Sequence, residues 1–451
     1  MARENTLALL GGALIDVRDG SVLPETAVLV REGRIAWIGG REDFSPPPGA
    51  RVEDVTGAWL IPGLVDMHVH LTFASLHTEL LPLYLAHGVT TVRDVGGHLT
   101  PLSLLRNELR SGRCLGPHLH FAGPLLDGVP PLWPSQTVLV DTEPRARSAV
   151  RMLIDQGVDC VKVYNNVPER SLEAIVEEAH AAGRPVLGHV PRTLRTSRAV
   201  EIGMDCLEHI RVTGRELLPL EEADQIDFLP LGRRETLLWE RFDIASPGME
   251  RLIELLVAAR TFLDPTLIVD ADTSLGSLQD PAAEETEAAL PAEARAALRR
   301  DVGMDKLRSP EDWRERAERG FEKRLDFIRR CNEAGVRLLA GTDTFGPGAM
   351  LPGAGLLNEL AYLHRAGLSP LQALQAATVT PAAALGTDGE TGTLEVGKHA
   401  DMVVLDGDPL ADVHNFRRIR LVVHGGAVST PASLIARAVE NVSSNAEGGG
   451  Q

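Results

Sequence analysis

The stretch that decides the fold reads Trp59-Leu60-Ile61-Pro62-Gly63-Leu64-Val65-Asp66-Met67-His68-Val69-His70. It is an apolar run that ends in two histidines two positions apart. Side chains two positions apart on a strand point to the same side, so His68 and His70 can bind one metal ion together. The same spacing also fits two unrelated histidines on an exposed strand. The interpretation of this pair therefore depends on the rest of the chain.

Short apolar runs alternate with helical patterns from this stretch onward. The eight strand-like runs are Leu60–Val69, Val89–Asp94, His118–Ala122, Cys160–Tyr164, Val186–His189, Cys206–His209, Phe262–Leu267 and Arg337–Thr342. This alternation predicts an α/β fold, a (β/α)₈ TIM barrel with insertions at about 211–247 and 269–309. We interpret both insertions as lids. An open doubly wound sheet is the alternative, but no glycine-rich dinucleotide fingerprint follows the first strand.

Both ends of the chain carry β-prone segments of a different style. The predicted strands are Leu7–Leu10, Ala13–Val17, Ala27–Arg31 and Arg34–Gly39 at one end, and Ala400–Leu405, Ile419–Val423 and Ala427–Val428 at the other. The simplest arrangement is one small composite β-sandwich domain, built from residues 1–58 and 391–442, beside a barrel of residues 59–390. The polar, glycine-rich residues 443–451 are expected to be disordered.

Composition narrows the class of protein. The chain has 451 residues, a formal net charge of −18, 44% apolar and 24% charged residues, and no block of basic residues. It contains no run of roughly 18 apolar residues, as a membrane helix requires, and no secretory signal pattern. Its four cysteines have no CxxC spacing. We expect a cytoplasmic enzyme that acts on a small molecule and binds neither nucleic acid nor membrane, and we leave open whether it forms a homo-oligomer.

Further strand ends carry residues that can bind a metal. Lys162 lies in the apolar run Cys160–Tyr164, and a buried ammonium needs a partner, a lowered pKa or chemical modification. A deprotonated lysine can take up CO₂ as a carbamate and bridge two cations, whereas a lysine standing alone would reach out to solvent. His189 and His209 each end a strand-like run, one βα unit apart, and Asp343 follows the last strand.

The order of these residues resembles that of the amidohydrolase superfamily, and their spacing resembles its imidazolonepropionase- and prolidase-like branch. Further matching segments are Leu85–Asp94, Gly335–Asp343, Ala366–Pro370, Thr380–Ala382 and Gly392–Asp401. The resemblance covers nearly the whole chain apart from the two insertions. It implies a barrel with a small composite β-domain, which agrees with the pattern of strands and helices.

The resemblance also implies a ligand set and a reaction. Two divalent metal ions, most readily Zn²⁺, would be bound by His68, His70 and Asp343 at the first ion, by His189 and His209 at the second, and by carbamylated Lys162 bridging both. The implied reaction is hydrolysis of a C–N amide bond in an N-acyl amino acid, dipeptide or cyclic amide by metal-activated hydroxide. Asp343 and Lys162 are the implied catalytic residues, with Asp343 as the proton shuttle. Tyr164 is implied as a substrate contact, although an aromatic plug at the strand end fits equally well.

Two other functions remain open at this stage. The same metal site could hydrolyse a phosphotriester, lactone or carbamate, because the nucleophile is common to all these reactions. A non-catalytic binding protein on the same scaffold would be expected to lack some ligands, and all six are present.

Other polar residues near strand ends are assigned structural roles. Arg93 and Asp94 end the second strand and are expected to form an ion pair. His118 and His120 also have ligand-like spacing, and we interpret them as a structural pair in the third strand.

Overall fold

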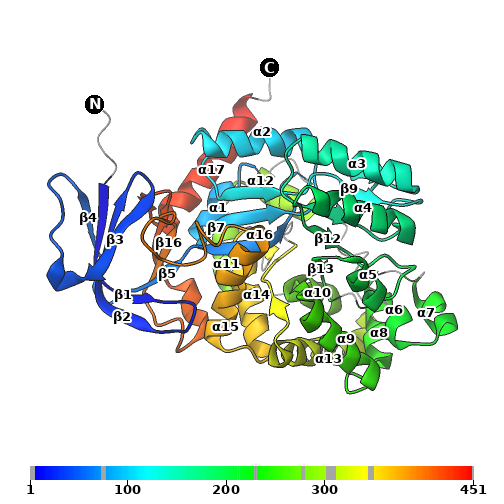
Figure 1. Cartoon of the computed structure of the whole chain (residues 1–451). Helices are drawn as coiled ribbons and strands as arrows, with labels where there is room; N and C mark the ends of the chain where they lie inside the picture. The colour runs from blue at the N-terminus through cyan, green and yellow to red at the C-terminus, as the bar shows by residue number, and fades with distance from the viewer. Residues whose placement is uncertain are drawn as a thin grey trace.

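The structure is a computed structural model that describes residues 6–72, 78–210, 212, 214–227, 229, 231–275, 280–300, 311–343 and 350–448. Parallel strands and helices alternate through the middle of the chain, and antiparallel strands lie at its two ends, so the fold is α/β (Figure 1). Among the described helices, none combines the length and the apolar character needed to cross a membrane.

All eight strands expected in the middle of the chain are present. They are β6 (Leu64–Val69), β7 (Val89–Asp94), β8 (His118–Phe121), β11 (Val161–Val163), β12 (Val186–Gly188), β13 (Cys206–Glu208), β14 (Phe262–Asp264) and β15 (Arg337–Leu338). Two short strands that were not expected, β9 (Leu125–Asp127) and β10 (Thr137–Leu139), follow β8. The ladders are parallel and form two sheets, β6-β7-β8 and β10-β9-β11-β12-β13-β14-β15.

These two sheets meet at both edges without a continuous ladder between the described strands. On one side the backbone N–H of Asp343 donates to the carbonyl of His68 over 2.7 Å. On the other side the N–H of Asp159 donates to the carbonyl of Phe121 over 2.9 Å. The arrangement is compatible with a ring of strands, and a fully closed (β/α)₈ barrel stays a prediction.

Helices connect successive parallel strands. Those outside the expected insertions are α1 (Leu81–Ala86), α2 (Leu99–Arg110), α3 (Glu143–Asp155), α4 (Glu169–Ala181), α5 (Thr196–Ile202), α9 (Pro247–Ala259), α13 (Arg314–Ala334), α14 (Ala354–Arg365), α15 (Pro370–Ala376) and α16 (Val379–Leu385). They pack on the strands through one large apolar cluster that includes Leu153, Ile175 and Phe327. The strands and helices thus share a single core.

The two expected insertions are helical where they are described. The first contains α6 (Gly214–Leu217), α7 (Leu220–Asp227) and α8 (Leu231–Arg241), and the second contains α10 (Leu267–Leu275), α11 (Pro281–Ala289) and α12 (Ala292–Arg300). Residues 301–309 of the second insertion lie outside the described residues. Helices agree with the apolar spacing of both segments, and a role as lids stays a prediction.

Strands from both ends of the chain form one further sheet. They are β1 (Thr6–Ile15), β2 (Val22–Arg31), β3 (Arg34–Gly40), β4 (Arg51–Asp54), β5 (Trp59–Pro62), β16 (Met402–Leu405), β17 (Ile419–His424) and β18 (Ala427–Ser429). Strand β5 pairs with β1 on one side and with β16 on the other, so the N-terminal and C-terminal segments lie side by side (Figure 1). Leu9, Val30 and Val404 belong to one apolar cluster that both chain ends share. The sheet therefore contains strands from both ends of the chain, and a separate small β-sandwich domain stays a prediction.

The two predicted strands Leu7–Leu10 and Ala13–Val17 are one strand in the structure. The register of the β1–β2 ladder shifts at Gly12, so β1 continues through the position at which the sequence pattern breaks. An irregularity of this kind bends a strand without ending its pairing.

The expectation of a single strand over Leu60–Val69 is wrong. The structure divides this run at Gly63, with β5 in the composite sheet and β6 in the parallel sheet. A Cβ atom on Gly63 would lie 2.1 Å from Thr90 Oγ1, and the Gly63 N–H donates to the Asp401 carbonyl over 2.9 Å. The absence of a side chain at Gly63 therefore allows the chain to pass close to Thr90 between β5 and β6. The composite sheet extends to Pro62.

The C-terminal segment also differs from expectation. Helix α17 (Pro431–Gly448) includes residues 443–448, which were expected to be disordered, and residues 449–451 lie outside the described part. Leu434, Ala438 and Val442 form a buried stripe at helical spacing. Ala438 and Val442 pack in the same apolar cluster as Leu83 of α1. The prediction failed because the helix continues for a turn beyond its last anchoring residue.

Candidate metal centre

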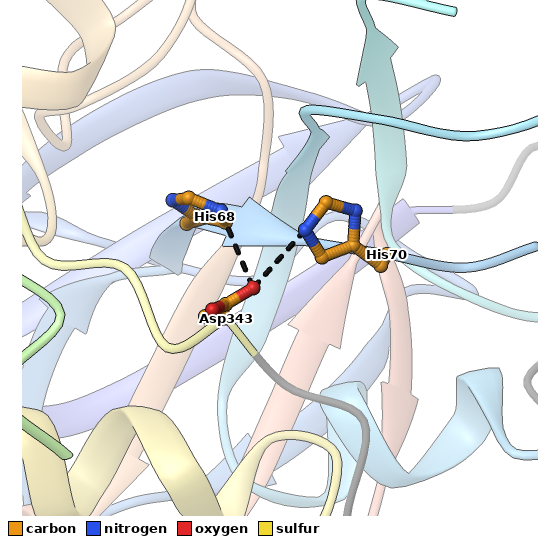
Figure 2. Close-up of side chains that lie close together, drawn as sticks. All are labelled: His68, His70 and Asp343. Carbon is orange, nitrogen blue, oxygen red and sulfur yellow. Dashed lines mark ion pairs between the residues drawn. The ribbon is translucent and has the colours of Figure 1, made fainter. Parts of the chain in front are cut away.

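The two histidines of the opening motif face Asp343 (Figure 2). His70 Nε2 lies 3.0 Å from Asp343 Oδ1, and His68 Nε2 lies 3.4 Å from the same oxygen. All three residues are buried, and each offers a ligand atom within 4.8 Å of the others. Asp343 has a left-handed backbone with a φ of 53°, which is uncommon for a residue other than glycine and is often found at functional sites.

The other two predicted histidines join this group. His189 and His209 directly follow β12 and β13, as the positions of the strand-like runs suggested. The ring centroids of His189 and His209 are 4.8 Å apart, and those of His209 and His68 are also 4.8 Å apart. His209 Nε2 lies 3.9 Å from Asp343 Oδ2. The structure therefore brings four histidines and one aspartate together at the carboxyl ends of parallel strands.

All four histidines are held through Nδ1 by an acceptor outside the group. The pairs are His68 with Glu208 Oε2 at 2.7 Å, His70 with the Gly96 carbonyl at 2.7 Å, His189 with Asn165 Oδ1 at 2.8 Å, and His209 with Thr266 Oγ1 at 2.6 Å. We assign the proton of each ring to Nδ1, which leaves the Nε2 lone pair free to bind a cation. Outer partners of this type orient metal-binding histidines.

These four outer partners were not predicted. Glu208 and Asn165 are each next to a predicted site residue in the sequence, which is a weak local signal. The histidine that each one supports belongs to a different strand, so the pairing emerges only when the strands are assembled.

Lys162 lies on β11, which pairs with β12, the strand that His189 follows, and its side chain is buried. Its Nζ has no hydrogen-bond partner among the described residues. Burial lowers the pKa of the amine, although Glu208 and Asp343 act in the opposite direction. Of the possibilities expected for a buried lysine, the structure therefore shows the lowered pKa and does not show a hydrogen-bond partner. A buried amine that has a lowered pKa and no hydrogen-bond partner is a candidate for chemical modification or for pairing with a bound ion.

A buried charge network lies beside the metal-ligand group. Arg93 Nη2 lies 2.8 Å from Glu208 Oε1 and 3.6 Å from Asp264 Oδ2. Burial alone would raise the pKa of Glu208, but Arg93, Lys162 and His68 hold it below its usual range. Glu208 is therefore ionised and accepts the hydrogen bond from His68.

The expected ion pair between Arg93 and Asp94 is wrong. No such pair occurs within the described part of the chain, and Asp94 instead accepts hydrogen bonds from the N–H groups of Leu71 and Gly96. Successive side chains on a strand point to opposite faces, so two adjacent residues of β7 do not meet.

Tyr164 stands beside the histidines. Its ring lies 4.1 Å from that of His189, and its hydroxyl accepts a hydrogen bond from Trp133 Nε1 over 3.1 Å. The tyrosine is half-buried. The position next to a metal-ligand candidate is compatible with a substrate contact, which stays a prediction.

Comparisons with known proteins agree with this arrangement. Residues 59–428 match the Amidohydrolase family. An ochratoxinase from Aspergillus niger is 23% identical over 483 residues, covering 93% of this chain and 85% of that protein. An imidazolonepropionase from Symbiobacterium thermophilum is 26% identical over 419 residues, covering 86% of this chain and 85% of that protein.

A solved structure gives the same answer for the fold. A Xaa-Pro dipeptidase with bound methionine in its active site has a TM-score of 0.67 at 20% identity, covering 94% of this chain and 100% of that one. At this identity the likeness concerns the fold alone. Together with the match over residues 59–428, these findings lead to one conclusion: the chain belongs to the amidohydrolase family, and its similarity to an imidazolonepropionase agrees with the branch that the sequence motifs indicated.

Proposed function

We propose that this protein is a metal-dependent hydrolase that cleaves a C–N amide bond in a small molecule, such as an N-acyl amino acid, a dipeptide or a cyclic amide. The observation that carries the proposal is the gathering of four buried histidines and Asp343, with each histidine held through Nδ1 by an acceptor outside the group. The names of the relatives favour an amide, because ochratoxinase, imidazolonepropionase and Xaa-Pro dipeptidase all recur among them.

The donor set fits two divalent ions. The residues that would hold them are His68, His70, His189, His209, Asp343 and Lys162. Imidazole and carboxylate donors suit Zn²⁺. The amine of Lys162 would add to CO₂ with formation of an N–C bond and release of one proton, and the resulting carbamate supplies an anionic bridge where Nζ otherwise has no partner. When bound, such ions act as Lewis acids that lower the pKa of a water molecule and polarise a carbonyl.

Asp343 is the residue placed to move the proton. Its carboxylate lies between the two parts of the group, with Oδ1 3.0 Å from His70 and Oδ2 3.9 Å from His209. It would accept the proton of the attacking water and deliver it to the leaving nitrogen, while the new C–O bond forms and the C–N bond breaks. The products are a carboxylic acid and an amine. Tyr164 would contact the substrate beside this reaction centre, and its ring, 4.1 Å from that of His189, supports this role.

Metal analysis and substitution of His68 test the proposal. We expect purified protein to carry up to two divalent ions at this centre, and His68→Ala to remove most of that metal together with the activity. The matched control is His180→Ala, because His180 also pairs with a carboxylate, Asp205 at 2.8 Å, but on an exposed helix. An active-site centre that is metal-free after growth with ample zinc, or a His68→Ala variant of unchanged activity, would contradict the proposal.

A hydrolysis screen tests the bond. The panel would contain N-acyl amino acids, Xaa-Pro dipeptides, cyclic imides, lactones, carbamates and phosphotriesters, each with His68→Ala as the blank. Cleavage confined to the amides supports the proposed class. Cleavage confined to a phosphotriester, lactone or carbamate would show that the same centre catalyses one of the alternative reactions. Absence of any metal-dependent cleavage would favour a binding protein.

A further inference from the structure

A second group of histidines lies away from the hydrolytic centre. His118 is the first residue of β8, whereas His70 follows the last residue of β6 in the same parallel sheet, so the two groups occupy opposite ends of the parallel strands. Asp401 directly precedes β16, and His424 is the last residue of β17. One member therefore comes from the parallel sheet and two come from the composite sheet.

The three side chains have the spacing of a metal site. His118 Nε2 lies 3.0 Å from Asp401 Oδ2, and His424 Nδ1 lies 3.0 Å from Asp401 Oδ1. The rings of His118 and His424 are 4.6 Å apart, and one ligand atom from each of the three residues lies within 4.8 Å of the others. Ligand atoms around a tetrahedral Zn²⁺ at about 2.0–2.2 Å are roughly 3.3–3.5 Å from one another. Small side-chain adjustments would thus place one ion among them.

The hydrogen bonding of this group is incomplete. His424 Nδ1 is buried, and despite its closeness to Asp401 it forms no hydrogen bond within the described part of the chain. Leaving a buried nitrogen without a hydrogen bond is unfavourable. A cation bound to its lone pair would remove that cost.

The carboxylate of Asp401 is buried between the two histidines of this group. Asp401 Oδ1 is also held by the N–H of Gly425 at 2.8 Å. The side chain of His118 is 37% exposed, which leaves a route for an ion from solvent. His118 thus has a partner of its own, and it is not simply one half of a structural pair with His120.

We propose that His118, Asp401 and His424 bind one divalent transition metal ion, most readily Zn²⁺, at a site separate from the hydrolytic centre. Two imidazole nitrogens and a carboxylate oxygen are a donor set that zinc accepts. The ion would join the start of β8 to the composite sheet and so stabilise the contact between the two sheets. The site is independent of the proposed hydrolysis, because none of its three residues belongs to the hydrolytic centre.

Zinc binding by substituted protein tests this site. Purified wild type, His118→Gln and His424→Gln would be dialysed to equilibrium against a small excess of free Zn²⁺, and zinc per chain would be measured. We expect each variant to bind one zinc fewer than wild type and to keep the hydrolytic activity. Glutamine still carries an amide that can donate to Asp401, so the fold should survive, and thermal unfolding of each variant checks this. His180→Gln, which removes an exposed histidine–aspartate pair, should bind as much zinc as wild type.

The His68→Ala background separates the two sites. Protein with His68→Ala should retain the zinc at His424, and adding His424→Gln should reduce that zinc at least tenfold. Added Zn²⁺ should raise the Tm of His68→Ala but not of the double variant. Equal zinc content in wild type, His118→Gln and His424→Gln would overturn the proposal and leave a metal-free His–Asp–His contact. That result would not affect the hydrolytic centre, which His68→Ala alone reports.

Discussion

At the scale of single residues, the direction in which each histidine points determines what the centre can bind. His68, His189 and His209 were placed at strand ends by the sequence pattern, and the structure shows their rings in contact. The pattern could not show which nitrogen faces the centre. That is decided by acceptors such as Glu208 and Thr266, which reach the rings from other parts of the chain.

Lys162 offers a direct test of the proposed carbamate. We expect Lys162→Ala to lose most of the activity and much of the bound metal, because the anionic bridge is removed. Millimolar acetate or propionate should restore part of the activity, since a small carboxylate can enter the space left by the buried side chain. Lys162→Arg is the control, because its guanidinium fills the space and forms no carbamate. Full activity of Lys162→Ala without added carboxylate would contradict a role for the lysine.

Thr266 tests the outer partners of the histidines. Thr266→Val keeps the shape of the side chain but removes the acceptor for His209 Nδ1 at 2.6 Å. We expect metal affinity or activity to fall about 10–100-fold, measured by metal titration and kcat/KM. Thr273→Val is the matched control, because Thr273 is also buried on α10 but donates to the Val269 carbonyl. Equal affinities in the two variants would show that Thr266 does not orient the ligand.

At the scale of elements, the residues of the candidate metal centre lie mainly at the ends of strands. His68 lies near the end of β6, the other three histidines directly follow β6, β12 and β13, and the segment after β15 carries Asp343. The strand-like runs were located from their apolar periodicity, which is a local property. The division of the first run at Gly63 was missed, because the reason for it is the approach of Thr90 from another strand.

Gly341 controls the close approach of two such elements. A Cβ atom there would lie 2.3 Å from Asp264 Oδ2 and 2.6 Å from His68 Cβ. Gly341→Ala should therefore displace His68 and reduce kcat/KM by at least about tenfold, since misplacement of about 1 Å is enough for a large effect. Gly389→Ala is the control, because no atom lies within 4 Å of its added Cβ. Unchanged kinetics of Gly341→Ala would show that the site tolerates such a shift.

Helix α17 is held by a few buried side chains. Leu434 is 2% exposed, so Leu434→Ala should lower the free energy of unfolding by about 2–5 kcal/mol. The measurement is denaturant or thermal unfolding. Arg437→Ala on the same helix should change it little, because the Arg437 side chain is 58% exposed and its ion pair with Glu440 is at the surface. Similar stabilities of the two variants would mean that the C-terminal helix is not anchored to the core.

At the scale of the whole molecule, segments that are far apart in the chain come together at two places, the composite sheet and the candidate metal centre. The composite sheet unites both chain ends through β5 and β16, with Leu60 opposite Val404. The candidate metal centre unites the ends of several parallel strands, from His68 to Asp343. Any ion bound there therefore cross-links distant parts of the fold.

Removing metal from the intact protein should thus lower its stability as well as its activity. A ligand that binds only the folded state adds about 2.7 kcal/mol when present at a hundred times its Kd. We expect a chelator to lower the Tm of wild type and to abolish hydrolysis, and added Zn²⁺ to restore both. His68→Ala should show a smaller loss of Tm on chelation. A wild-type Tm that is unchanged by complete metal removal would contradict metal binding at either site.

The amino-acid sequence by itself determined the alternation of parallel strands and helices, the β-rich chain ends and the ligand positions at strand ends. These features depend on the periodicity of apolar residues and on the residue that closes each run, both of which are local. Only the tertiary structure decided the division at Gly63, the extent of α17 beyond Val442, and the partners of Arg93, His68 and His118. Each of these depends on side chains that come close only after distant segments pack. The order of His68 and His70 with other residues in the sequence therefore identified a candidate metal centre. The tertiary structure showed which acceptors orient their rings.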